Sequence, residues 1–372
     1  MASTQTRSQR TTTTHDGISN INNAHNSNNN KPTYTVAHLL TKITTLIETC
    51  DFELAYTFCL RALAMESDNV AVLEATGAVE LELEKFEEAR EHFSKAISLS
   101  PSRGSSKYMY MGQLSENLDS INYFQTGIDL MTEELKSVSA ASTSEEQEHH
   151  QALCRKISTA LCSMTEIYLT DCCFESDAES RCESYLNRAI EIDKSNPEVY
   201  QVLASVRLSQ QRKEDAKLAL ENSINLWINA EPGMYSNAIM PTYAARISLV
   251  KLLLELSQYN RALTVLDGLQ KEDDEMIELW YLYGWSYYCM GEDASNDEEK
   301  SSNWEDARDC LNTCKKLFNK FESDDDGICQ HTQELLQTIN AFLKPSTSAS
   351  EDECSSFGAR ERYVAPYYYP FD

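Results

Sequence analysis

A repeat of helical pairs, with a period near 34 residues, constrains the fold of this chain more than any other sequence feature. Residues 70–101 show it best, because small and apolar side chains recur there at helical intervals: Leu73, Gly77, Ala89, Phe93, Ala96 and Pro101. Gly77 leaves room for a second helix to cross closely, and we expect Phe93 to wedge between neighbouring units. Pro101 ends the second helix, because proline has no backbone N–H to donate.

The second helix of each unit can be followed through one small residue. This residue recurs at Ala55, Ala89, Ser120, Cys182, Ala216, Ala262 and Ala307, at successive distances of 34, 31, 62, 34, 46 and 45 residues. The longer distances indicate polar insertions near residues 137–150, 171–178, 227–239 and 292–303, which we expect on the rim of a stacked array. The sequence therefore predicts an all-α superhelical solenoid over residues 34–343, with about seven helical pairs and a capping helix near 329–343. An unrelated helical bundle is the alternative.

Residues 280–287 carry the spacing Trp-x-x-Tyr-Gly-x-x-Tyr. With the 34-residue unit, this segment resembles the tetratricopeptide-repeat family. The resemblance implies a binding scaffold whose first helices line a concave groove. Co-chaperones of this family hold acidic peptides through a basic clamp, but the corresponding positions here are Leu40, Thr44, Ala75 and Ala78. This difference disfavours a role as a general co-chaperone.

Composition separates both ends from the repeats. Residues 1–33 are rich in Ser, Thr and Asn and predict a disordered leader, and residues 344–372 read as an acidic, Tyr-rich tail without a fold of its own. The whole chain has 59 acidic and 32 basic residues, so its net charge is −27. This excess disfavours direct nucleic-acid binding, which needs a basic surface, and favours basic partners.

The chain lacks the motifs of common enzyme classes. It contains no glycine-rich phosphate loop, and none of its seven histidines belongs to a recognisable catalytic motif. Cys172, Cys173 and Cys182 cluster near Asp171 and Asp177, but no C-x-x-C pair is present. We therefore expect no catalysis, no cofactor, no bound metal and no small-molecule substrate, and we interpret these cysteines as small buried fillers.

Cysteine content and hydropathy also suggest a compartment. Twelve cysteines are too dilute for a disulfide scaffold, the first residues do not resemble a secretory signal, and no apolar stretch is long enough to span a membrane. We expect a protein of the cytoplasm or the nucleus with no membrane contact.

Projecting each first helix gives candidates for the groove. They are Glu74, Glu82, Glu116, Glu166, Glu198, Gln201, Glu278, Tyr281 and Trp285. The glutamates predict a Lys- or Arg-rich ligand, although a merely solvated helix face would look the same. Tyr281 and Trp285 could form an aromatic binding surface or pack against a neighbouring helix.

The chain as a whole resembles a narrower group within that family, the dedicated assembly chaperones of the fourth large-subunit ribosomal protein. The resemblance rests on the Thr- and Asn-rich leader, the unit at 71–101, the aromatic helix at 278–288, the acidic insertion after Gly291 and the acidic end. It implies a chaperone that captures a newly made, basic ribosomal protein, prevents its aggregation and escorts it to preribosome assembly. The alternative is a scaffold subunit of another complex.

Overall fold

The structure, a computed structural model, describes residues 34–138, 143–228, 240–321 and 326–343. Within these ranges the chain forms fifteen α-helices and no β-strand, which confirms the predicted all-α class. The predicted leader at 1–33, the tail at 344–372 and most of the insertion at 227–239 lie outside the described residues.

The helices form seven consecutive pairs and one further helix. The pairs are α1 (Val36–Glu48) with α2 (Phe52–Met65), α3 (Val70–Glu82) with α4 (Phe86–Leu99), α5 (Ser106–Leu114) with α6 (Asn117–Val138), α7 (Ser144–Leu169) with α8 (Ala178–Ile192), α9 (Pro197–Ser209) with α10 (Lys213–Asn225), α11 (Tyr243–Glu255) with α12 (Tyr259–Glu272), and α13 (Ile277–Glu292) with α14 (Asp297–Phe321). The last helix is α15 (Asp326–Leu343), which packs on α13 and α14 as the predicted cap.

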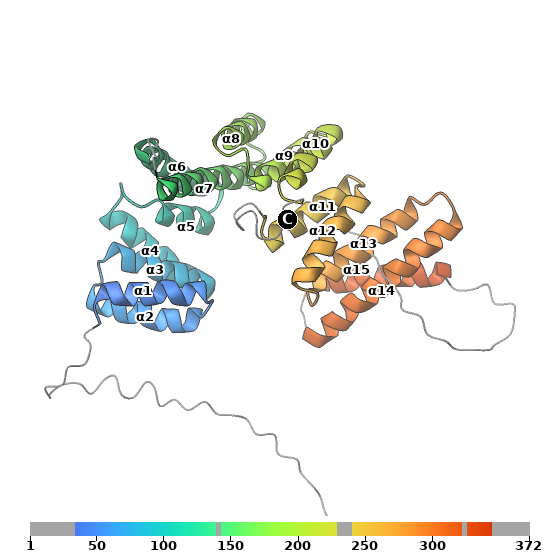
Figure 1. The fold of residues 1–372 in the computed structure, drawn as a ribbon, viewed down its shortest axis with the longest axis horizontal. Coiled ribbons are helices and arrows are strands. Elements are labelled where there is room, and N and C mark those ends of the chain that lie inside the picture. The colour runs from blue at the N-terminus through green and yellow to red at the C-terminus, as the bar shows by residue number, and fades with distance from the viewer. Residues whose placement is uncertain (1–33, 139–142, 229–239, 322–325, 344–372) are drawn as a thin grey trace, which may run out of the picture.

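The pairs stack into an open arch (Figure 1). Helices α1–α5 form one end, α6–α10 cross the top, and α11–α15 form the other end. Consecutive first helices contact each other in two runs, from α1 through α3 to α5 and from α7 through α9, α11 and α13 to α15. Helix α6 packs on both α5 and α7 and thereby joins the two runs.

The small residues that set the repeat register occupy the centre of each pair. All seven predicted anchors, from Ala55 to Ala307, are no more than 2% exposed. A Cβ atom added to Gly77 would lie 2.7 Å from the Phe93 ring, and one added to Gly112 would lie 2.9 Å from the Phe124 ring. Each glycine therefore lets an aromatic wedge of the second helix reach the first, because any side chain there would collide with the ring.

Two of the predicted insertions lengthen helices. Residues 144–150 form the first turns of α7, because Thr143 and Glu146 make a reciprocal capping box that starts the helix there. Residues 297–303 likewise belong to α14. Residues 171–177 instead connect α7 to α8 through a turn.

Five of the seven turns between first and second helices share one backbone feature. Cys50, Glu84, Asn117, Gln211 and Ser257 all have φ between 51° and 59°. At these five turns the left-handed conformation lets the chain reverse from the first helix into the second. Side chains other than glycine adopt it at a cost, because the Cβ atom approaches the following carbonyl oxygen.

Candidate binding face

The first-helix face is the surface formed by the solvent-facing residues of α1, α3, α5, α7, α9, α11 and α13. Six of the nine predicted site residues have partly or fully exposed side chains on this face. They are Glu74, Glu82, Glu166, Glu198, Glu278 and Trp285. Within the described residues, Glu82 and Glu166 form no ion pair, whereas Glu74 and Glu278 each form one.

Glu74 holds a buried lysine. Its Oε1 atom lies 3.2 Å from the Nζ atom of Lys107, which belongs to α5 and is fully buried. The same ammonium also donates to the backbone carbonyl oxygens of Arg103 and Gly104. Glu74 therefore stabilises the junction of the second and third pairs, and it is a poor choice for a charge-reversal variant, because the change would set two cations together in the interior.

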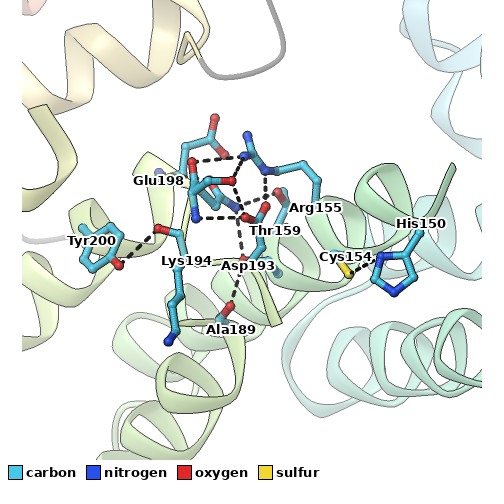
Figure 2. A network of polar contacts seen from close by, with 12 residues as sticks. His150, Cys154, Arg155, Thr159, Ala189, Asp193, Lys194, Glu198 and Tyr200 are labelled. Carbon is cyan, nitrogen blue, oxygen red and sulfur yellow. Dashed lines mark hydrogen bonds and ion pairs between the residues drawn. The ribbon is translucent and has the colours of Figure 1, made fainter. Parts of the chain in front are cut away.

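Glu278 and Glu198 also lie beside cations on neighbouring first helices. Glu278 Oε1 of α13 is 2.7 Å from Lys251 Nζ of α11. Glu198 of α9 lies close to Arg155 of α7, which bonds to Asp193 and to the carbonyl oxygen of Ser195 in the turn before α9 (Figure 2). This arginine fastens the fourth pair to the fifth.

Glu166 and Glu198 repel each other across α7 and α9. Removal of water by the surrounding protein raises the pKa of Glu166, and the nearby carboxylate of Glu198 raises it further. Desolvation also raises the pKa of Glu198, although Arg155 opposes this shift. Both carboxylates would gain from another cation, because the charge on each is incompletely solvated.

Three predicted site residues do not belong to the first-helix face. Gln201 is buried, and its Nε2 atom lies 3.4 Å from Ser223 Oγ of α10. Tyr281 is also buried, with its ring edge-on to His331 of the capping helix. Glu116 lies in the turn between α5 and α6, because α5 ends at Leu114. These three assignments are corrected, since side-chain burial and helix length depend on neighbouring helices.

Trp285 is partly exposed and also contacts the cap. Its ring lies 4.8 Å from that of His331 and 6.5 Å from that of Tyr288. Tyr281 and Trp285 thus both pack against the capping helix, which is one of the two alternatives expected for them.

Sequence reasoning missed two residues on or near this face. Glu255, the last residue of α11, is exposed, and desolvation raises its pKa while Lys213 opposes the shift. It occupies the position in its helix that Glu82 occupies in α3, so the repeat register contained the signal. Lys107 had no such signal, because nothing in its local sequence indicates burial.

Three of the histidines in the described chain have structural partners. His38 completes the N-terminal cap of α1, His92 pairs with Glu80, and His149 pairs with Glu134. Cys172 and Cys182 are buried, as their interpretation as fillers predicts, but Cys173 is exposed, so that interpretation is wrong for it. Over the described ranges, no group of three or more His, Cys, Asp or Glu is placed to hold a metal ion. None of the helices described is long and apolar enough to cross a bilayer.

Comparisons with known proteins identify relatives along most of the chain, although no protein-family model matches it. A protein of Schizosaccharomyces pombe named "Probable assembly chaperone of rpl4" is 34% identical over 292 residues, which cover 75% of this chain and 83% of the relative. A protein of the same name from Emericella nidulans is 30% identical over 331 residues, covering 82% and 81%. The solved structure of residues 1–338 of an assembly chaperone of RpL4 has a TM-score of 0.62 at 31% identity, over 70% of this chain and 98% of that one.

Proposed function

The chain belongs to the family of rpl4 assembly chaperones, and on this premise we propose that it captures a newly made rpl4-type ribosomal protein and protects it until preribosome assembly. The observation that carries the proposal is the likeness to two curated relatives of that name over most of the chain. The tetratricopeptide-type solenoid supports it, because such arrays act by binding along an extended surface. We accordingly propose a binding protein that needs neither a catalytic step nor a cofactor.

The client is proposed to lie on the first-helix face. A large-subunit ribosomal protein is basic, and this chain carries a net charge of −27. Glu82 and Glu166 supply carboxylates without an ion pair among the described residues, and Glu198 lies next to Glu166. A lysine or arginine of the client would relieve the repulsion between Glu166 and Glu198 and stabilise the charge on both carboxylates.

The first test is direct binding. Purified chain and rpl4 of the same organism are expected to form a stoichiometric complex in about 0.1 M salt that weakens steeply as salt rises, because exposed charges are screened. Capture of an unrelated stable assembly at all salt concentrations, with no rpl4, would support a scaffold role and contradict the proposal.

The second test locates the site. The double variant Glu82→Gln with Glu166→Gln is expected to weaken rpl4 binding about tenfold at low salt while helicity is unchanged, since two charge contacts of roughly 0.5–1 kcal/mol each are removed. The matched control, Glu53→Gln with Glu191→Gln, removes the same charge from exposed second-helix positions and should bind like the wild type. Equal affinity of both double variants would place the client elsewhere.

A further inference from the structure

We propose that the outer edge between the third and fourth helical pairs is a second docking surface, which binds an extended basic segment of the client that carries an apolar side chain. The proposal rests on the proposed function, because it assumes the same client. It adds a surface built from helix ends and turns, in addition to the first-helix face.

An open pocket of about 540 Å³ marks this edge. Three segments converge there: α4, the end of α5 with the start of α6, and the turn between α7 and α8. The lining residues that matter for the argument are Arg90, Glu116, Leu118, Asp119, Asp171 and Glu175.

Apolar side chains are displayed at the same edge. Phe174 lies between the lining residues Cys172 and Glu175, and its side chain is 98% exposed. Leu118, which lines the pocket itself, is 46% exposed. Phenylalanine is among the residues most often buried, and an exposed aromatic side chain beside a concavity is typical of interaction sites.

The turn that presents Phe174 is ordered by its own hydrogen bonds. The backbone N–H of Cys172 donates to the carbonyl oxygen of Ile167, that of Cys173 to Thr170, and that of Glu175 to Cys172. Cys172 is buried and anchors the turn against the fourth pair. Phe174 is therefore held out on a fixed support, so a partner would lose little entropy in ordering it.

The negative charge of the pocket favours a basic partner. Glu116, Asp119, Asp171 and Glu175 form no ion pair within the described part of the chain, whereas Arg90 lies 3.7 Å from Glu87. Four uncompensated carboxylates beside two apolar side chains fit a segment in which lysine or arginine neighbours an aliphatic or aromatic residue. A basic client that leaves the first-helix face over this edge supplies such a segment.

The test compares variants of the full chain for binding to full-length rpl4, by titration calorimetry in about 0.1 M and 0.3 M salt. Phe174→Ser is expected to weaken binding about tenfold at both salt concentrations, because an apolar anchor is lost. Asp171→Asn with Glu175→Gln is expected to weaken it about threefold at 0.1 M salt and less at 0.3 M salt, because its contribution is screened.

Two controls separate this surface from general effects. Leu218→Ser alters another exposed apolar residue, on α10, and Glu53→Gln with Glu191→Gln removes the same charge elsewhere. Both variants should bind within twofold of wild type. Wild-type affinity of Phe174→Ser, or a change only in self-association measured by light scattering, would overturn the inference and leave the proposed function intact. Failure of the wild type to bind rpl4 would overturn both.

Discussion

At the scale of the residue, Glu80 carries an unusual charge for its position. Its side chain on α3 is 1% exposed, and Oε2 lies 2.7 Å from His92 Nδ1 of α4. The other carboxylate oxygen, Oε1, is buried without a hydrogen-bond partner among the described residues. His92 is therefore the main compensation for a buried acid, and the second helical pair depends on that contact.

This contact predicts a pH-dependent stability. The hydrogen bond to Glu80 raises the pKa of His92 above its ordinary value of 6.5. The stabilisation is fully present below about pH 6.5 and is lost as the pH rises through the raised pKa, because protonated His92 is favoured in the folded state. His92→Ala should lower the unfolding free energy by about 2 kcal/mol at pH 6, since it strands a buried carboxylate.

Urea denaturation at pH 6 and pH 8 measures this effect. The difference in stability between wild type and His92→Ala should shrink at pH 8. His149→Ala, which alters an exposed pair with Glu134, is the matched control and should change little. A difference that stays constant with pH would show that His92 acts by packing alone.

The sequence predicted the exposure of the glutamates on the first-helix face correctly, but not that of the polar and aromatic residues beside them. Glu82, Glu166 and Glu198 are partly or fully exposed there, because they follow the helical period of each unit. Gln201 and Tyr281 follow the same period but are buried by α10 and α15. Whether a side chain at such a position remains exposed depends on the angle at which the next helix packs. That angle cannot be predicted from the sequence of one helical pair alone.

At the scale of the element, the turns with positive φ store strain that can be relieved. Glu84 has φ of 58° between α3 and α4, and its exposed side chain makes no ion pair within the described ranges. Glu84→Gly should raise the unfolding free energy by up to about 1 kcal/mol, because glycine adopts this conformation without a steric penalty. Glu88→Gly, inside α4, should lower it by about 1 kcal/mol.

Thermal or urea unfolding of both variants would measure these opposite shifts. A loss of stability in Glu84→Gly would mean that the flexibility gained by the unfolded chain outweighs the strain relieved.

The positions of the helices follow from small-residue spacing alone, whereas the lengths of α7 and α14 do not. Their extra turns come from polar segments, in which capping decides whether a helix starts early.

At the scale of the whole molecule, α15 closes the end of the array. Leu336 and Ile339 are buried against α13 and α14, and His331 covers Tyr281 and Trp285. Ile339→Asp should detach this helix, lower the first thermal transition by about 5 °C or more and increase binding of a hydrophobic dye, because a terminal unit without its cap exposes apolar surface. Gln337 is exposed nearby, so the control variant Gln337→Asp should behave as wild type. An unchanged thermal transition in Ile339→Asp would show that the array needs no cap.

The two runs of touching first helices also present side chains to a bound segment at a regular spacing. Helices in direct contact lie about 8–10 Å apart, and an extended chain advances about 3.3 Å per residue, so a segment crossing them meets a new helix about every three residues. This regular spacing is interrupted at α6, because the run that ends at α5 and the run that begins at α7 are joined there by a second helix. The spacing of basic side chains along a bound segment, rather than their number, then sets how many carboxylates it engages at once.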